Sequence, residues 1–312
     1  MKIIHLSYPL NLRVDDFPDM GQVLAIGYFD GVHSGHQEVI QTAITIGKKT
    51  NKPVSLMTFH PHPREVLGHS SNHKYLTPLE EKLDLFAQMG VDYTYIFAFD
   101  TMFSQVSPLG FIEEVLLPLQ VQSVVVGFNF TFGHKGSGTP DELGKLSKGR
   151  IKVKVVQPFY LDGDKVSSTL IREQLQSGQI HKANELLGHA YTLSGTVVAG
   201  DGRGRTMGIP TANIEINKPF FIPGNGVYAV KVQFNGLMYN GVMNIGHKPT
   251  FSKDPLGTSL EVHILNFEGM IYDEDLIVHF ISFLRHETKF ASIDQLIGQI
   301  HQDIEQAKLW LV

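Results

Sequence analysis

The sequence contains no cysteine. Neither disulfide bonds nor thiolate metal sites can therefore stabilise the fold, and no thiol nucleophile is available for catalysis. The chain also lacks any run of about 20 apolar residues, the length that is needed to cross a bilayer. Its first residues, MKIIHLSYPLNLR, have no long apolar core of the kind found in a signal peptide. We therefore expect a cytoplasmic protein that is neither exported nor embedded in a membrane.

An excess of positive charge is missing as well. The chain has 26 lysines and arginines against 31 aspartates and glutamates, with a formal net charge of −5. Proteins that bind nucleic acid through its phosphates need clustered Lys and Arg, so we expect no nucleic-acid partner and only small phosphate ligands. With 42% hydrophobic and 18% charged residues, the composition is that of a folded globular protein. We expect a monomer or a weak homo-oligomer.

The first half of the chain alternates short apolar runs with stretches of helical periodicity. This alternation is typical of βαβ units around a parallel sheet. Helices are predicted over 78–90 and 168–178, with Ser168 as the N-cap of the second, and a shorter helix ends at Gly188. The runs predicted as strands are 23–27, 54–59, 93–99, 123–127 and, as a fifth, 152–159.

After residue 188 the pattern changes to alternating strands separated by turn residues. Asn235 and Gly236 lie between two such strands and predict a hairpin with a type I′ turn. A set of antiparallel strands must close or pack on itself to hide its edges, so we expect a small barrel. We therefore predict an α/β domain over 1–187 and an all-β domain over 188–312. A C-terminal helix should pack on the barrel through Ile293, Leu296, Ile297, Ile300 and Ile304.

The most informative local segment is GYFDGVHSGHQEVI, residues 27–40, in which a predicted strand leads through a glycine-rich turn into a helix. Gly31 and Gly35 allow the backbone to approach a ligand closely. The N-terminus of the following helix offers unpaired N–H groups and a partial positive charge, which favour phosphate. His33 and His36 can then donate hydrogen bonds to phosphate oxygens.

Two other interpretations of these histidines remain open. Either one could be a buried polar residue or a metal ligand. A zinc site would need further ligands, for which His60 and His62 are candidates, although TFHPHP is better interpreted as a loop stiffened by proline. Two histidines in an HxGH frame directly after a strand favour nucleotide chemistry.

The second half has its own glycine-rich segment, GTVVAGDGRGRTMGIPTANI, residues 195–214. GDGRGR lacks the GxGxxG spacing of a dinucleotide-binding turn and no helix is expected after it, so that interpretation is rejected. A flap over phosphates followed by Pro210, Thr211 and Asn213 as oxygen donors fits a nucleotide and Mg²⁺ better. The glycines expected to bind phosphate here are Gly202, Gly204 and Gly208.

The first half resembles the HxGH nucleotidylyltransferases, and within them the adenylyltransferase half of prokaryotic bifunctional FAD synthetases. Besides the HxGH segment, TFHPHPREVL, GFNFTFGHKGSG and SSTLIREQL occur in the order of that family and cover most of 20–180. The resemblance implies a Rossmann-like domain in which His33 and His36 contact ATP phosphates and Asn129 contacts flavin. It also implies that ATP or its phosphates are bound by Gly27, Phe29, Asp30, Gly31, Gly35, Ser168 and Thr169.

Arg172 lies one helical turn after the Ser-Thr pair, where a guanidinium would suit a pyrophosphate leaving group. The alternative is that Arg172 belongs to a solvated helix face. The sequence also departs from the family in this half: many relatives have an acidic residue at Asn129 and an arginine near Gly136. We expect this loop to bind flavin or phosphate differently from the loop of those relatives.

The second half, 189–312, resembles riboflavin kinase, because GVYA, GVMNIGHKPTF, LEVHILNF and LRHETKF appear in the order of that family. The resemblance implies that Thr211 and Asn213 hold Mg²⁺ and ATP, that Glu261 is the catalytic base and that Arg285 contacts flavin. From its alternating strand alone, Glu261 either faces inward to serve a ligand or faces outward as an ordinary surface residue. Lys248 and Asn266 stand where relatives more often have Arg and Asp, and we expect these two changes to tune affinity.

Together, the two resemblances predict an enzyme that phosphorylates riboflavin to FMN and then adenylylates FMN to FAD with release of pyrophosphate. ATP is the co-substrate and Mg²⁺ the cofactor. Two alternatives remain: only one half is active, for example the kinase alone, or the protein is a flavin- or nucleotide-binding regulator without turnover. Formation of FAD from FMN and ATP would distinguish the bifunctional enzyme from both.

Overall fold

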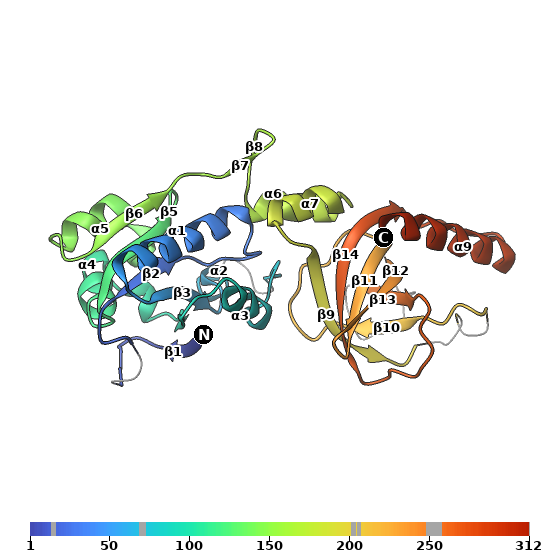
Figure 1. Cartoon of the computed structure of the whole chain (residues 1–312), viewed down its shortest axis with the longest axis horizontal. Coiled ribbons are helices and arrows are strands. Elements are labelled where there is room, and N and C mark those ends of the chain that lie inside the picture. The colour runs from blue at the N-terminus through green and yellow to red at the C-terminus, as the bar shows by residue number, and fades with distance from the viewer. Residues whose placement is uncertain (14–16, 69–72, 201–203, 205–206, 248–257, 312) are drawn as a thin grey trace. The chain divides into compact units, whose positions relative to one another are not determined.

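The computed structural model describes residues 1–312 except 14–16, 69–72, 201–203, 205–206, 248–257 and 312. The chain forms two compact units, Met1–Val166 and Ser167–Val312, which we call unit 1 and unit 2 (Figure 1). The functional boundary after residue 187 stays a prediction, because compactness alone does not decide which activity residues 167–187 serve.

Unit 1 is built around a parallel β-sheet. Its strand order is β1-β4-β3-β2-β5-β6, and each neighbouring pair runs parallel. This confirms the predicted α/β architecture and its five predicted strands, and it adds β1 at one edge. The strands are β1 (Lys2–Leu6), β2 (Gln22–Ile26), β3 (Val54–His60), β4 (Tyr93–Ala98), β5 (Val121–Gly127) and β6 (Lys152–Val156).

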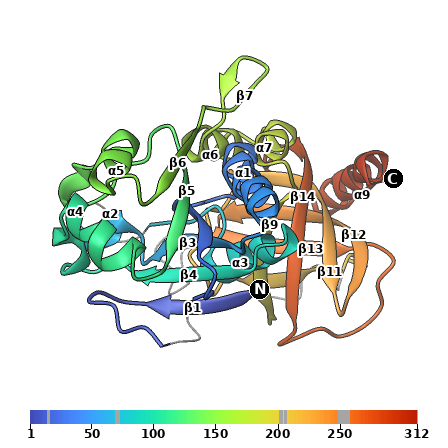
Figure 2. The same cartoon turned by 60° about the vertical axis from the view of Figure 1, so that its left-hand side comes forward.

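Helical segments cover both faces of this sheet (Figures 1 and 2). Every residue of β2 is buried, as expected for a central strand of a parallel sheet. Val23 and Ala25 pack with residues of α1 and α3 on one face. Leu24 and Ile26 pack on the other face with the π-helical segment Phe111–Leu116. The helices are α1 (Ser34–Thr50), α2 (Pro63–Val66), α3 (Leu79–Gln88), α4 (Pro108–Gly110) and α5 (Pro140–Leu146), and a small hairpin is formed by β7 (Tyr160–Leu161) and β8 (Asp164–Lys165).

Unit 2 contains a closed antiparallel barrel with a C-terminal helix packed on its outside, as predicted. The strand order is β10-β13-β12-β11-β14-β9, and each neighbouring pair is antiparallel. Asn235 and Gly236 join β11 to β12 with φ of 48° and 76°, which agrees with the predicted type I′ turn. The elements are α6 (Ser168–Gln176), α7 (Ile180–Leu187), β9 (Tyr191–Val198), β10 (Ala212–Glu215), β11 (Gly226–Phe234), β12 (Leu237–His247), β13 (Thr258–Ile264), β14 (Asp275–Arg285) and α9 (Ile293–Trp310).

Two helix predictions in unit 2 need correction. The N-cap of α6 is Ser167, whose hydroxyl accepts a hydrogen bond from Leu170 N at 3.2 Å, so Ser168 is the first helical residue. The predicted apolar stripe of α9 does not pack as a whole. Ile293 is 65% exposed, and the helix meets the outer barrel surface at its other end, through Ile304, Ala307 and the following Leu311.

Candidate active sites

The glycine-rich loop after β2, residues 27–33, leaves the sheet where the strand order reverses. After β2 the chain passes through α1 to β3 on one side, whereas β5 pairs with the other side of β2. In open parallel sheets, ligands bind in the crevice that such a reversal creates at the carboxyl ends of the strands. The loop 27–33 therefore lies at the place in this sheet where a nucleotide site is expected.

The loop 27–33 has a strained backbone. Phe29 and Val32 have φ of 56° and 40°, which is rare for residues with a bulky or branched side chain, and Gly31 has φ of 87°. The ring of Phe29 is 1% exposed and packs edge-on against Phe86 and His36, with ring centroids 5.7 and 5.4 Å apart. The side chain of Phe29 thus anchors the loop, and only its backbone is left for the predicted contact with phosphate.

Two glycines of the site lie against these aromatic rings. A β carbon at Gly27 would lie 2.9 Å from the ring of Phe29, and one at Gly35 would lie 3.3 Å from the ring of His33. Both contacts are tighter than ordinary van der Waals packing. A larger residue at either position would therefore crowd these rings, and the predicted close approach of Gly31 and Gly35 to a ligand stays a prediction.

The two histidines stack at the start of α1. Their ring centroids are 3.6 Å apart with an interplanar angle of 15°. His33 is the N-cap of α1, and its Nδ1 accepts a hydrogen bond from His36 N at 3.3 Å. A neutral His33 therefore carries its ring proton on Nε2. The structure brings the two histidines together at a helix N-terminus, as the HxGH pattern predicted.

The environment of His36 disfavours its protonated form. Burial, and then the nearby positive charges of His33 and Lys82, hold the pKa of His36 well below its ordinary value of 6.5. Among the described residues, its buried Nδ1 has no hydrogen-bond partner. His36 is therefore neutral near pH 7 until negative charge arrives, and a triphosphate would supply that charge.

Asp30 and Asn129 also lie around this edge of the sheet. Asp30 is 4% exposed, and its Oδ1 accepts a hydrogen bond from Thr77 N at 3.2 Å. The exposed Asn129 follows β5, and its neighbour Phe128 presents a partly exposed ring with Lys165 Nζ 4.9 Å from the centroid. Gly136 has φ of 65°, a backbone conformation that favours glycine.

The remaining residues predicted for adenylyl transfer lie in unit 2, on α6. Arg172 Nη1 donates to the carbonyl oxygen of Ser168 at 3.3 Å, and its guanidinium carbon lies 5.9 Å from the ring centroid of Phe221. The guanidinium is thus held beside the first turn of α6, as its spacing from the Ser-Thr pair predicted. Thr169 is exposed.

The predicted kinase residues of unit 2 form a row across the barrel. Glu261 on β13 is paired in register with Asn213 on β10 and with Asn244 on β12. Paired residues of antiparallel strands project from the same face. Val242, which shares this face with Asn244, packs against α9 outside the barrel. The row therefore lies on the outer surface, so Glu261 faces outward and not into the barrel.

Two glycines, Gly200 and Gly204, lie against residues at this end of β10. A β carbon at Gly200 would overlap the side-chain amide of Asn213, and one at Gly204 would overlap the backbone before Thr211 and lie 3.2 Å from its hydroxyl oxygen. The structure therefore brings Thr211, Asn213 and these two glycines together. Gly208 has φ of 74°, and Gly202 and Lys248 lie outside the described residues.

Three residues of this outer surface were missed from the sequence. Asn244 completes the row, Ser259 Oγ donates to Glu261 Oε1 at 2.9 Å, and the carboxylate of Glu287 lies against Gly246 beside the amide of Asn244. Alternation along β13 could have indicated Ser259, which is two residues from Glu261. The other two depend on strand register and on the course of a loop.

Arg285 and Asn266 have structural settings that the sequence did not indicate. Arg285 Nε and Nη2 donate to the two carboxylate oxygens of Asp303 on α9, each at 2.8 Å. Its predicted contact with flavin stays a prediction. Asn266 lies in the turn after β13 with φ of 55°, a conformation that asparagine tolerates well.

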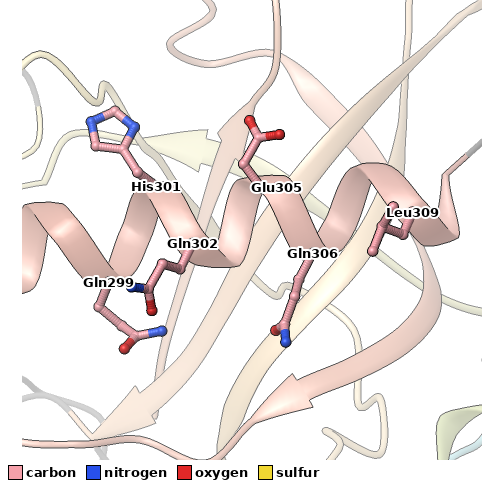
Figure 3. Close-up of a pocket in the computed structure, with 6 residues that line it drawn as sticks. All are labelled: Gln299, His301, Gln302, Glu305, Gln306 and Leu309. Atoms are coloured by element: carbon pink, nitrogen blue, oxygen red, sulfur yellow. The ribbon is translucent and has the colours of Figure 1, made fainter.

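A surface hollow of about 610 Å³ lies away from these residues (Figure 3). It is an open surface along α9 that no predicted site residue lines. A second hollow of about 510 Å³ lies on α6 and includes Arg172 and Phe221. The lining residues of the first are Gln299, His301, Gln302, Glu305, Gln306 and Leu309.

Comparison with protein families finds two models in succession along the chain. The FAD synthetase model matches residues 17–170, and the riboflavin kinase model matches residues 187–311. A bifunctional riboflavin kinase/FMN adenylyltransferase of Listeria monocytogenes is 43% identical over 309 residues, covering 99% of this chain and 98% of the relative. Proteins of the same description from Bacillus subtilis and Escherichia coli K12 are 42% and 38% identical, covering 98% and 92% of this chain and 97% and 91% of their own.

Among solved structures, a protein described as a macrolide-efflux protein from Streptococcus pneumoniae matches with a TM-score of 0.90 and 30% identity. The match covers 99% of this chain and 100% of that one. In the described part of this chain, no helix is long and apolar enough to cross a membrane.

Proposed function

The chain belongs to the family of bifunctional riboflavin kinases/FMN adenylyltransferases, and from this we infer that it phosphorylates riboflavin to FMN and adenylylates FMN to FAD with release of pyrophosphate. The observation that carries the inference is that each unit has its own candidate phosphate-binding site. In unit 1 it is the histidine pair at the start of α1. In unit 2 it is Gly200 and Gly204 against Asn213 and Thr211, with Glu261 paired to Asn213.

In the kinase step, Glu261 accepts the proton of the ribityl 5′-hydroxyl while that oxygen attacks the γ-phosphorus of ATP. Its position on the outer barrel surface supports this role, because a substrate can reach it there without entering the packed interior. The hydrogen bond from Ser259 orients the carboxylate. Phosphoryl transfer depends mainly on alignment and electrostatics, so no covalent intermediate with the protein is needed.

Thr211 and Asn213 are the residues that would hold Mg²⁺. Their side-chain oxygens are hard ligands of the kind that Mg²⁺ prefers, and their position against Gly200 and Gly204, with Glu261 paired to Asn213, fits such an ion. When bound, the ion would neutralise charge on the transferring phosphoryl group.

In the adenylyl step, the phosphate of FMN attacks the α-phosphorus of ATP, and pyrophosphate leaves toward His33, His36 and Arg172. The phosphate is already a nucleophile near neutral pH, so the protein's task is to orient it and to stabilise the leaving charge. Approach of the triphosphate raises the proton affinity of His36, which is neutral before binding. Flavin contacts are assigned to Asn129 in this site and to Arg285 in the kinase site.

We assign 1–187 to the adenylyltransferase and 188–312 to the kinase, which the ranges of the two family models support. We further propose that the protein works in the cytoplasm with small-molecule substrates only, as a monomer or weak homo-oligomer.

Two variants of the full chain test the division of labour. With Glu261→Gln, FMN formation from riboflavin and ATP should fall by about 100-fold or more, because a carboxylate base contributes roughly that factor, while added FMN is still converted to FAD. With His36→Ala, the reverse is expected. Chromatographic time courses of riboflavin, FMN and FAD measure both steps in one assay.

Loss of both activities in either variant would contradict separate sites. If the wild-type protein formed FMN but never FAD, only the kinase half would be active. If it bound nucleotide and formed neither product, it would be a binding protein.

A further inference from the structure

A buried lysine packs against the loop 27–33 of unit 1. Lys82 on α3 is 2% exposed, on the same face as Phe86 one turn later. Its Nζ donates a hydrogen bond to the carbonyl oxygen of Tyr28 at 2.8 Å and lies 4.3 Å from the centroid of the Tyr28 ring. Removing an ammonium group from water is unfavourable unless other groups compensate, so a lysine at this depth requires an explanation.

Three successive residues of the loop, 28–30, are held by α3 and by Thr77, which lies just before this helix. Lys82 holds the carbonyl of Tyr28, and Phe86 packs against the ring of Phe29. The third contact is the hydrogen bond from the backbone N–H of Thr77 to the carboxylate of Asp30. Because Phe29 has an unfavourable positive φ, the loop keeps its shape only where neighbours enforce it.

The charge of Lys82 also acts on His36. The groups that face it electrostatically are Asp30 from the loop, which favours its charged form, and His36 from α1, whose pKa it lowers. The aromatic face of Tyr28 adds a cation–π contact. The net result of burial and Asp30 is a pKa of about 8 for Lys82.

We propose that Lys82 is a positioning residue for adenylyl transfer, which holds the loop 27–33 in its binding shape through the Tyr28 carbonyl and provides a positive charge beneath His36. The proposal rests on the proposed adenylyltransferase function of unit 1. A charge fixed by the fold stabilises the departing pyrophosphate without reorganisation during the reaction. The contribution of Lys82 passes through the loop and His36, and Lys82 itself touches no reacting atom.

The titration of Lys82 gives the proposal a specific pH signature. Below pH 8 the ammonium is charged, and as pH rises through about 8 it loses its proton in the unliganded protein. The kcat/KM for ATP reports the free enzyme, so it should fall by up to about tenfold per pH unit above that value. The FMN phosphate, with a second pKa of about 6, is already fully ionised there and cannot cause this limb.

Folding stability should change with the opposite sign. The unfolded chain keeps this lysine proton up to about pH 10.4. Between pH 8 and that value the unfolded state therefore binds more protons than the folded state, and this group makes the fold more stable as pH rises. A residue that served only the fold would not lower activity while stability increases.

The test uses full-length Lys82→Met, Lys82→Arg and, as a matched control, Lys49→Met at the exposed last turn of α1. FAD formation from FMN and ATP is measured from pH 6.5 to 9.5, with riboflavin phosphorylation as the internal control and circular dichroism as the folding control. We expect Lys82→Met to lower kcat/KM for adenylylation roughly 10- to 100-fold, as misplacement of a site typically does. Lys82→Arg should retain activity and lose the alkaline limb, because arginine stays charged.

Wild-type kcat/KM in folded Lys82→Met, or an alkaline limb that persists in Lys82→Arg, would overturn the proposal. If Lys82→Met does not fold, the pH dependence of kcat/KM in the wild-type protein decides. A kcat/KM that does not change across pH 8 overturns the proposal. Failure of the proposed function looks different, since the wild-type protein itself would then form no FAD from FMN.

Discussion

Breaking the ion pair between Arg285 and Asp303 should destabilise unit 2 strongly. The side chain of Asp303 is 2% exposed and that of Arg285 is 21% exposed, with two hydrogen bonds of 2.8 Å between them. In Arg285→Met, the one hydrogen bond from a described side chain that remains on the buried carboxylate of Asp303 is that from Gln299 Nε2 at 3.0 Å. Removing one partner of a buried pair costs about 3–5 kcal/mol. For a domain of this size, that corresponds to a decrease in Tm of roughly 6–20 °C.

The single tryptophan of the chain offers a direct assay. Trp310 lies at the end of α9 and is 54% exposed, so its fluorescence reports on the helix that the ion pair attaches to the barrel. Urea unfolding followed by fluorescence and by circular dichroism gives the free energy of unfolding for each variant. A loss below about 1 kcal/mol in Arg285→Met, the range of exposed ion pairs, would refute the reasoning.

A double-mutant cycle separates the interaction energy of Arg285 and Asp303 from the effects of their other contacts. In Asp303→Leu the unpaired Arg285 still has its hydrogen bonds to His286 O and Thr288 Oγ1, both 3.0 Å, and is partly accessible to water. We therefore expect a smaller loss than in Arg285→Met. The double variant should be close to the wild type, because apolar replacement of a buried pair is often neutral. A riboflavin KM that rises in Arg285→Met but not in Asp303→Leu would support the predicted flavin contact.

Two further predictions concern sites where the packing leaves no freedom. Gly200→Ala should lower riboflavin phosphorylation at least about tenfold by displacing the amide of Asn213, as expected for a small misplacement, while FAD formation from added FMN is retained in the same assay. Gln22→Leu should destabilise unit 1 by about 2 kcal/mol or more in urea unfolding followed by circular dichroism, because each buried group that loses its partner costs about 1–3 kcal/mol. The groups that lose a hydrogen bond to Gln22 include the hydroxyl of Ser55 and the backbone carbonyl of Leu119.

The sequence predicted most of the central strands of both units, because buried strands appear as continuous or alternating apolar runs. The edge strand β1 was missed, since its KIIHL is short and buried at only two positions. Periodicity assigned α9 a packing stripe that includes Ile293. That pattern cannot tell which part of an amphipathic helix meets a partner, and here the contact is made by the last turns.

The candidate sites were predicted through their motifs and not through their partners. HxGH indicated His33 and His36, but their stacking and the low pKa of His36 depend on burial that only the folded loop creates. Lys82 carried no signal, because a lysine within a helix is ordinarily assigned to its polar face. The row through Glu261 required the strand register, which brings together residues far apart in the chain.

Because Glu261 faces outward, β13 serves the proposed catalysis with one face and the stability of the barrel with the other. On β13, Leu260, Val262 and Ile264 are buried, whereas Glu261 and His263 alternate with them and are partly exposed. Evolution can therefore vary the outer positions to alter turnover or substrate preference while the protein's cellular abundance, which depends on the inner positions, is preserved. The same alternation means that new chemistry could be selected on this surface without first redesigning the barrel.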